Sequence, residues 1–286
     1  MQKWERDHTF TKAPKIDQNP IAFLSITQHQ VFMRTTKLLF LIAFSFITCS
    51  ENDSPKVVID RIEFNDNEVG VFYYNSNKLL SKYELFSNNE LYSYKEFIYS
   101  NNQLVKRNNF LKGKNGFIST SDTYIYENDK IVEIVDDTFS FKHFATWDGD
   151  RIVKMSYCYE NGDCFSYDKL EYDGVGNIVK VYRYAITEDR ENVEKVSEYF
   201  YDNKVNPLHQ FTSPAKLFFG DFNFYESSIN NITKYDEKNT VNSLPYRTTS
   251  YTLTYNENGL PNEVSISLVS GISVINSKRK FYYKTI

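Results

Sequence analysis

The sequence has few of the residues that define several large classes of protein. Of its 286 residues, 10 are Gly and 7 are Pro, which excludes a collagen-like chain or a long flexible linker. The 33 Lys and Arg are outnumbered by 37 Asp and Glu, so the chain lacks the basic excess typical of nucleic-acid binders, and we expect no nucleic-acid partner. Only 4 His and 3 Cys are present, which leaves little material for a metal site.

Familiar catalytic motifs are missing as well. The chain contains no His-Glu-x-x-His, no Gly-x-Ser-x-Gly and no phosphate-cradling Gly-rich loop. His143 could act as a base with Asp136 or Asp137, but a solvated or hydrogen-bonded strand histidine is the simpler interpretation. Asp148-Gly149-Asp150 could help to hold calcium, although a tight turn explains the same residues better. We therefore predict no catalytic residue, no metal site and no cofactor, and expect a protein that is not an enzyme.

The first recognisable feature is an export segment. A short basic stretch, Met33 to Lys37, precedes an apolar stretch from Leu38 to Thr48 that is too short to cross a bilayer as a helix. This order is typical of a secretory signal, so we predict that Met33 is the initiator, that residues 1–32 are a non-native upstream extension, and that residues 33–48 are the signal peptide. A plain cleaved signal, or a short buried element of a soluble protein, is the alternative.

The end of this segment resembles the lipobox of bacterial lipoproteins, in which the signal is cut before a Cys that carries acyl chains. The residues are Phe46-Ile47-Thr48-Cys49, and they depart from the usual pattern at Phe46 and Thr48. The resemblance implies that Cys49 is a lipid anchor. The residues after it are polar and acidic and lack a hydrophobic period, so we predict that residues 49–56 are a flexible tether to the membrane. The acidic residues that follow Cys49 also resemble the export signal of some Gram-negative surface lipoproteins. The expected location is the outer membrane, with exposure at the cell surface if the second resemblance holds.

From Val57 onward the chain alternates short aromatic and β-branched runs with clusters of Asn, Asp and Gly. One unit recurs: two aromatic residues spaced by one, a polar turn, and then an aliphatic pair. Its copies are 72–79, 97–106, 124–133, 146–154, 171–180, 199–205 and 251–260. Residues two apart point to the same face of a strand, and Asn, Asp and Gly tolerate the positive φ of tight turns. Residues 57–286 are thus predicted to form an all-β domain, an extended, twisted antiparallel β-meander built from repeated hairpins.

The clearest copy, Tyr172-Asp173-Gly174 followed by Gly176-Asn177-Ile178, resembles the YD repeat of the Rhs and teneurin family. Copies with Asn after the aromatic residue are similar to divergent YD-like domains of Gram-negative lipoproteins of a domain-of-unknown-function family. Residues 201–207 and 229–234 are similar to those lipoproteins too. The resemblance covers roughly residues 60–286 and implies a fold more than a chemistry. Rhs shells carry many more repeats, and we expect this chain to be too short for a comparable chamber.

Residues 207–250 interrupt the repeat with Pro207, Pro214 and Pro245 and with an aromatic run over 217–225. We expect an irregular insertion here, with a short helical turn near 213–218. Such an insertion could cap the sheet or form the lip of a binding site.

Two cysteines remain if Cys49 carries lipid, and they flank a short turn. A two-residue Asn161-Gly162 turn would pair Cys158 with Phe165 and place the two sulfurs on opposite faces. A three-residue loop with Gly162 in the left-handed conformation would instead place Cys158 directly opposite Cys164. An oxidising envelope favours the bond, so we predict a Cys158–Cys164 disulfide, with two free thiols as the alternative.

The function expected from the sequence is that of a non-enzymatic envelope lipoprotein, which binds a glycan or protein partner or serves as a scaffold. Exposed Tyr and Phe can stack on sugars or anchor a protein, although most of them are expected to pack within the sheet. One alternative is an envelope carbohydrate-active enzyme with its site near residues 207–246. Another is a shell-like YD protein that wraps a partner. The sequence does not indicate an oligomeric state.

Overall fold

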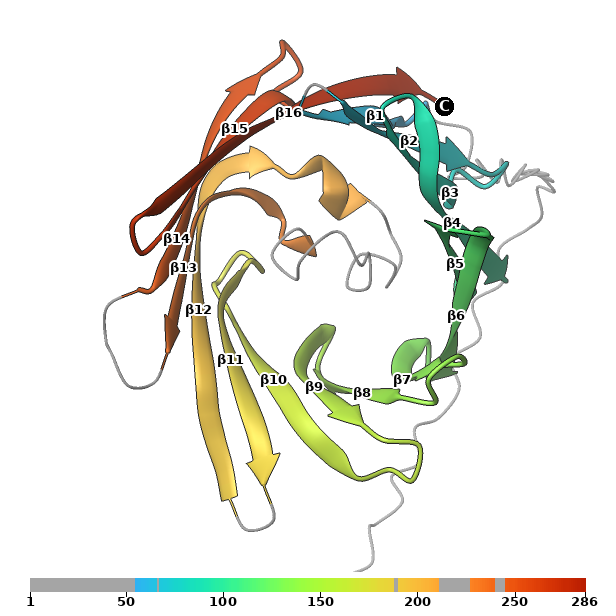
Figure 1. Ribbon diagram of the computed structural model, residues 1–286, viewed down its shortest axis with the longest axis vertical. Coiled ribbons are helices and arrows are strands. Elements are labelled where there is room, and N and C mark those ends of the chain that lie inside the picture. The colour runs from blue at the N-terminus through green and yellow to red at the C-terminus, as the bar shows by residue number, and fades with distance from the viewer. Residues whose placement is uncertain (1–54, 66, 188–189, 211–226, 240–244) are drawn as a thin grey trace, which may run out of the picture. The chain divides into compact units, whose positions relative to one another are not determined.

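The computed structural model describes residues 55–65, 67–187, 190–210, 227–239 and 245–286. Within these residues, 16 strands form one antiparallel sheet that closes into a barrel, and neighbouring strands follow one another along the chain (Figure 1). The strands are β1 (Val57–Phe64), β2 (Glu68–Tyr74), β3 (Leu80–Ser87), β4 (Glu90–Ser100), β5 (Gln103–Gly113), β6 (Gly116–Glu127), β7 (Lys130–Asp136), β8 (Lys142–Asp148), β9 (Arg151–Cys158), β10 (Cys164–Tyr172), β11 (Ile178–Thr187), β12 (Arg190–Val205), β13 (Asn230–Asn239), β14 (Arg247–Tyr255), β15 (Pro261–Ser270) and β16 (Ser273–Thr285). The prediction of an all-β antiparallel meander made of hairpins is confirmed.

Closure of the sheet is the feature that the sequence did not indicate. β1 pairs with β16 from Val57, opposite Thr285, to Phe64, opposite Arg279. Beyond the ladder, the backbones of Lys56 and Ile286 exchange two hydrogen bonds of 3.0 Å. An extended meander would leave two strands with unpaired backbone groups at its edges, and closure pairs them with each other.

The recurring aromatic residue builds a ring of hydrogen bonds at one end of the barrel, which we call the tyrosine rim. At this end an aromatic side chain donates to the backbone carbonyl of the preceding strand, over 2.6 to 3.0 Å. The donor and acceptor pairs are Tyr74 and Ile59, Tyr99 and Leu80, Tyr126 and Leu104, Trp147 and Ile131, Tyr172 and Ile152, Tyr201 and Ile178, and Tyr283 and Pro261. The same contact is thus repeated in hairpin after hairpin, which explains why the aromatic position recurs.

The polar residue after the aromatic one shapes the turn. Asp173 Oδ1 accepts hydrogen bonds from the backbone N–H groups of Val175, Gly176 and Asn177, at 2.7 to 2.9 Å. Asn75 and Asn256 make the equivalent bonds in their own turns. An Asp or Asn side chain that bonds its own backbone two residues on is a standard means of stabilising a turn.

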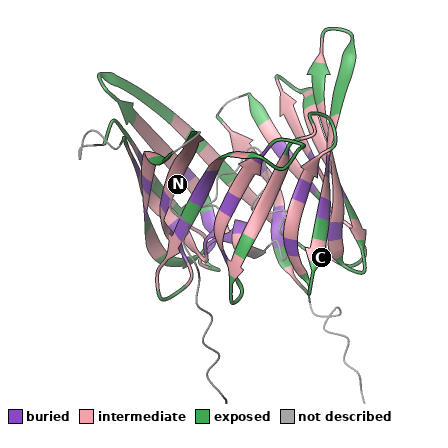
Figure 2. Ribbon diagram, turned by 90° about the horizontal axis from the view of Figure 1, so that it is seen from below, coloured by how far each residue is buried: buried purple, intermediate pink, exposed green. Residues whose placement is uncertain are grey.

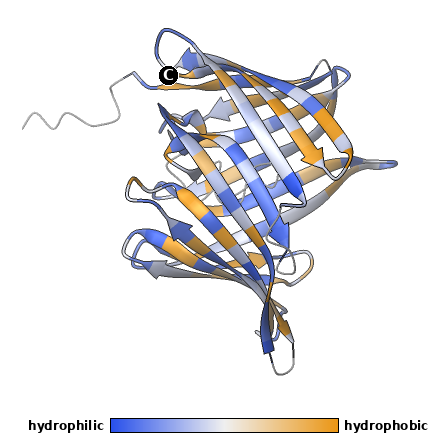
Figure 3. Cartoon of the chain, turned by 90° about the vertical axis from the view of Figure 1, so that its left-hand side faces the viewer, coloured by the Kyte–Doolittle hydropathy of each residue, from blue (hydrophilic) through white to orange (hydrophobic). Residues whose placement is uncertain are grey.

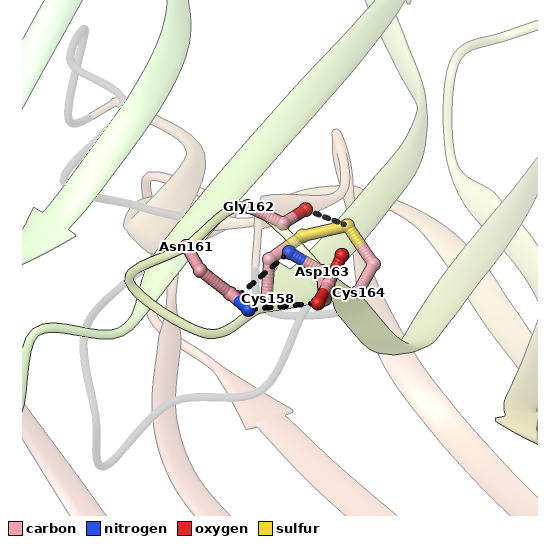
Figure 4. Close-up of a disulfide and its surroundings, with 5 residues drawn as sticks. All are labelled: Cys158, Asn161, Gly162, Asp163 and Cys164. Atoms are coloured by element: carbon pink, nitrogen blue, oxygen red, sulfur yellow. Dashed lines mark hydrogen bonds between the residues drawn. A yellow bond between two sulfur atoms is a disulfide. The ribbon is translucent and has the colours of Figure 1, made fainter.

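The β9–β10 hairpin carries a disulfide (Figure 4). Cys158 and Cys164 are direct Cα partners and are joined through their sulfurs. Gly162 has a φ of 90° in the connecting loop, and the Tyr159 N–H donates to the Asp163 carbonyl over 2.9 Å. The predicted bond is confirmed, with Gly162 in the left-handed region as expected.

The expected insertion is only partly irregular. It begins with a 3₁₀ turn, η1 (Pro207–Gln210), yet Asn230–Asn239 is a regular strand, β13. The helical turn expected near 213–218 and the aromatic run over 217–225 lie outside the described residues. Leu208 of η1 packs into the largest buried apolar cluster, beside residues such as Ile62 and Phe72. Figure 2 shows that buried residues lie along the strands and that exposed residues concentrate at the hairpin ends.

Candidate functional site: the barrel lumen

Alternation along each strand divides the sheet into an inner and an outer wall. The short turn η1 lies inside the ring of strands in Figure 1, and its Leu208 belongs to the same buried cluster as Ile62 and Phe72, which therefore mark the inner wall. Directly paired residues share a face of the sheet, so the ladder extends this assignment from strand to strand. Phe72 pairs with Tyr83, and Tyr83 pairs with Lys95.

The first polar contact on the inner wall joins β5 and β6. Arg107 Nη2 lies 2.7 Å from Asp122 Oδ2, and its Nε donates to the same oxygen over 2.8 Å. Asn109 Nδ2 also donates to this oxygen, over 3.0 Å. Both charged side chains are only 11% exposed, so this ion pair is enclosed by protein.

The second contact joins β9, β10 and β11. Arg183 donates two hydrogen bonds to Asp168, from Nε to Oδ1 at 2.9 Å and from Nη2 to Oδ2 at 2.7 Å. The Tyr157 hydroxyl donates to Asp168 Oδ2 over 2.8 Å. The bonds to Asp168 raise the pKa of Arg183 further above its usual range, and burial followed by the charge of Asp168 raises that of Tyr157. The guanidinium therefore stays charged and the phenol stays protonated.

The third contact joins β12, β13 and β14. Glu237 lies between two cations, with Lys195 Nζ 2.6 Å from Oε1 and Arg247 Nη1 3.7 Å from Oε2. Burial alone would raise the pKa of Glu237, but the hydrogen bond and charge of Lys195 outweigh it and hold the pKa below the usual value. This carboxylate is ionised, and two positive groups lie beside it.

His143 is the candidate base suggested by the sequence, and it lies on the inner wall. Its ring contacts that of Tyr157, with centroids 5.1 Å apart. Burial lowers the pKa of His143, and the charges of Asp122 and Asp136 oppose this effect. Asp137, the other suggested partner, instead accepts hydrogen bonds from Ser121 and Thr123. The histidine thus packs against Tyr157, close to the charges of Asp122 and Asp136.

Water reaches part of this inner wall. The side chains of Arg183, Lys195 and Arg247 are 40%, 32% and 44% exposed although they point inward. Barrels of about 16 strands are wide enough to hold water, unlike barrels of 8 strands that side chains fill. The lumen beside β11–β14 is therefore accessible to a polar ligand.

The tyrosine-rim end of the lumen is apolar. A pocket lies there between η1 and the strands β13–β16, and Arg279 is its one charged side chain. The apolar lining includes Leu208, Leu253, Val264 and Phe281. Nearby, His209 Nδ1 lies 2.8 Å from the Ser227 carbonyl oxygen, which links η1 to Ser227.

The outer wall is rich in ion pairs, and most of their partners are partly exposed, although Asp236 is buried. Lys82 lies 2.7 Å from Glu84, and Glu198 on β12 contacts both Lys180 at 3.3 Å and Lys238 at 2.5 Å. Further pairs are Lys142 with Glu133, Lys234 with Asp236, Lys278 with Glu263, and Lys284 with Asp60. Figure 3 shows hydrophilic and hydrophobic residues interleaved along the strands.

Neither a family model nor a curated protein matches the chain. A solved structure does match: a porin-like protein from Bacteroides uniformis ATCC 8492, with a TM-score of 0.52 and 12% sequence identity, over 79% of this chain and 98% of that one. The two proteins share a barrel fold. A second porin-like protein, from Bacteroides vulgatus ATCC 8482, matches with a TM-score of 0.39 and 10% identity, over 80% of this chain and 99% of that one.

Two candidates from the sequence remain, Cys49 and the Asp148-Gly149-Asp150 turn. Cys49 lies outside the described residues. In the Asp148-Gly149-Asp150 turn, Gly149 has a φ of 54° and Asp150 lies 3.5 Å from Lys130, as the turn interpretation expected. The described ranges contain no group of three or more His, Cys, Asp or Glu side chains placed to hold a metal ion. No helix in the same ranges is both long and apolar enough to cross a membrane.

Sequence reasoning missed the inner ion pairs. Their partners are 15 residues apart in Arg107–Asp122 and Asp168–Arg183, and 42 apart in Lys195–Glu237 (237 − 195). A charged residue two positions from an apolar residue on the same strand, such as Asp168 before Leu170, was the available signal. It could have marked inward charges, but it could not have named their partners.

Proposed function

We propose that this protein is a non-enzymatic binding protein of the cell envelope, which holds a polar ligand in the lumen of its barrel. The ligand is a glycan or a segment of a partner protein. The observation that carries the proposal is the water-accessible inner wall, where charged and aromatic side chains of β9–β14 converge. Sites of this kind combine an apolar lining with a few well-placed polar groups. The shell-like alternative from the sequence fits the same geometry, because the inward faces of the repeats line the lumen.

The charged residues of the outer wall favour a barrel that is not embedded in the lipid bilayer. A membrane-spanning barrel presents an apolar band about 25 Å tall to the lipid, where a Lys or Arg costs about 2–4 kcal/mol at the midplane. The ion pairs of Glu198 with Lys180 and Lys238 would have to enter that band. We therefore propose that the barrel lies in water and that acyl chains on Cys49 attach it to the outer membrane.

Fractionation of cells tests the anchor. Wild-type protein should take up radioactive fatty acid and remain with the membranes, whereas Cys49→Ala should be unlabelled and soluble without detergent. A Cys49→Ala protein that stays in the membrane after an alkaline wash would show that the barrel itself is embedded.

A pair of tryptophan variants tests the lumen as the binding site. Ala185 lies on the inner wall, two residues after Arg183, and Thr252 lies on the outer wall with its side chain exposed. Purified wild-type protein is applied to a glycan array and to an envelope extract, and captured ligands are identified. Ala185→Trp should abolish capture and Thr252→Trp should leave it intact. Equal capture by both variants would place binding elsewhere.

A further inference from the structure

In the part of the inner wall formed by β11–β14, the basic side chains are exposed to the lumen and the acidic side chains are buried. Arg183, Lys195 and Arg247 belong to β11, β12 and β14, and Arg183 and Lys195 are direct Cα partners. Lys195 and Arg247 both contact Glu237. The three cations therefore form a continuous group across neighbouring strands.

The exposure of the two charge signs differs sharply. The cationic side chains are 32% to 44% exposed, whereas Asp168 is 1% exposed and Glu237 is 6% exposed. Three basic side chains thus pair with only two acidic ones, and the charged ends of the basic side chains are in contact with solvent in the lumen. A ligand that enters the lumen thus encounters a positive surface, because fields are strongest where charges line a concave, partly dry wall.

The two arginines of this group also have N–H donors that form no hydrogen bond with Asp168 or Glu237. A guanidinium carries five N–H donors, and Asp168 takes two from Arg183. The contact of Arg247 with Glu237, at 3.7 Å, is longer than a hydrogen bond. Arg107 offers a contrast on the same wall, since it and Asp122 are enclosed together. Only the β11–β14 sector combines charge, exposure and unused donors among the described ion pairs of the inner wall.

Aromatic side chains border the same sector. The Tyr199 and Tyr235 rings are stacked, with centroids 5.1 Å apart. Tyr246 is 45% exposed, and its hydroxyl donates a hydrogen bond to the Glu237 carboxylate. Tyrosines beside a cationic group suit a ligand that has both an apolar ring face and a negative charge.

We infer that the inner wall between β11 and β14 binds the carboxylate of an acidic saccharide, with Arg247 and Lys195 as its principal charge partners and Tyr246 beside the sugar ring. The inference rests on the proposed function, because it names the ligand class of the proposed lumen site. A fork-shaped guanidinium matches a carboxylate in two parallel hydrogen bonds, which gives Arg247 the larger expected role.

Calorimetric titration of the purified full-length protein tests this inference, with trigalacturonate as the acidic probe, galactotriose as the neutral one and triglutamate as the acidic peptide. Trigalacturonate should bind at least about tenfold more tightly than either of the others, and its binding should weaken as salt is added. Arg247→Gln should weaken trigalacturonate binding at least about tenfold, and Arg247→Lys should weaken it less. Lys195 keeps Glu237 paired in both variants.

Lys238→Gln is the matched control, because Lys238 lies on the outer wall of the neighbouring strand and pairs with Glu198. It should bind trigalacturonate as wild type does. Equal affinity for the neutral sugar, no effect of Arg247→Gln, or an equal loss in Lys238→Gln would overturn the inference. Preferred binding of triglutamate would replace the saccharide with an acidic peptide. If no probe binds while Ala185→Trp still abolishes capture from envelope extract, the anion inference fails and the lumen proposal stands.

Discussion

The inner and outer walls of this barrel are built from the same strands and carry the same kinds of side chain, yet they use charge differently. On β11, Arg183 points inward and bonds an aspartate that is 1% exposed, whereas Lys180 points outward toward a glutamate that is 24% exposed. Asp168 and Glu237 on the inner wall are nearly fully buried, whereas most acids of the outer ion pairs are partly exposed, with Asp236 at 7% as the exception. Ion pairs between exposed partners contribute little to stability, whereas a buried acid depends on its partner. Burying the inner charges costs folding free energy, as expected for a binding site, whereas the outer charges mainly hydrate the outer surface.

The largest expected effect concerns the apolar part of the inner wall. Leu104 is fully buried at the tyrosine rim, and Ile98 on the outer wall is 43% exposed. Leu104→Ala should lower the free energy of unfolding by about 3–5 kcal/mol, since it leaves a cavity, whereas Ile98→Ala should change it by about 0.5 kcal/mol. Urea denaturation measures both, and equal losses would contradict the assignment of the two walls.

The next largest effect concerns the ion pairs of β11. Arg183→Gln should cost about 2–3 kcal/mol, toward the low end for a broken buried pair because Tyr157 still bonds Asp168 and the arginine is partly exposed. Lys180→Gln should cost less than about 1 kcal/mol, since Lys238 keeps Glu198 paired. The same denaturation series decides the comparison. A Lys180→Gln variant as unstable as Arg183→Gln would show that the outer wall is also shielded from water.

A smaller effect separates two tyrosine hydroxyls. Tyr126 donates to the Leu104 carbonyl in the tyrosine rim, and Tyr73 donates to Glu84 on the outer wall. Tyr126→Phe should cost about 1–2 kcal/mol because it leaves a partly buried carbonyl without its donor, and Tyr73→Phe should cost about 0.5 kcal/mol or less. Thermal unfolding of both variants against wild type makes the measurement. Similar melting temperatures would mean that the ring of hydrogen bonds contributes nothing net.

The smallest effect is a pH dependence of the inner wall. Burial lowers the pKa of His143, so the folded protein binds this proton less readily than the unfolded chain does. The contribution is fully present above the unfolded pKa of about 6.5 and is lost as the pH falls through that value toward the lower folded pKa. Denaturation between pH 8 and pH 5 should show stability falling on the acid side, with a flatter profile in His143→Gln. An unchanged profile in that variant would assign the effect to the carboxylates.

Much of the fold could be predicted because its information is local. The aromatic pair, the Asn or Asp after it and the aliphatic pair define each hairpin within about ten residues, and Asp173 shows how one side chain shapes its own turn. The disulfide is similarly local, since Cys158 and Cys164 are 6 residues apart and a single turn geometry brings them together. Such contacts need no knowledge of the rest of the chain.

The candidate site could not be predicted in the same way. Glu237 meets Lys195 from 42 residues earlier (237 − 195) and Arg247 from the next strand, and this requires that β12, β13 and β14 take a particular register. A register shift of one residue would move all three side chains to the other wall. Nothing near any one of these residues in the sequence reports that register.

By itself, the sequence determined the hairpins, their turns and the direction in which each strand alternates, because backbone preference and side-chain period act over a few residues. Only the tertiary structure decided that β1 would meet β16, and hence that one face of the sheet would become a lumen and the other an exterior. The physical reason is that closure depends on the summed twist and register of every strand pair, a quantity that no single segment of the chain contains.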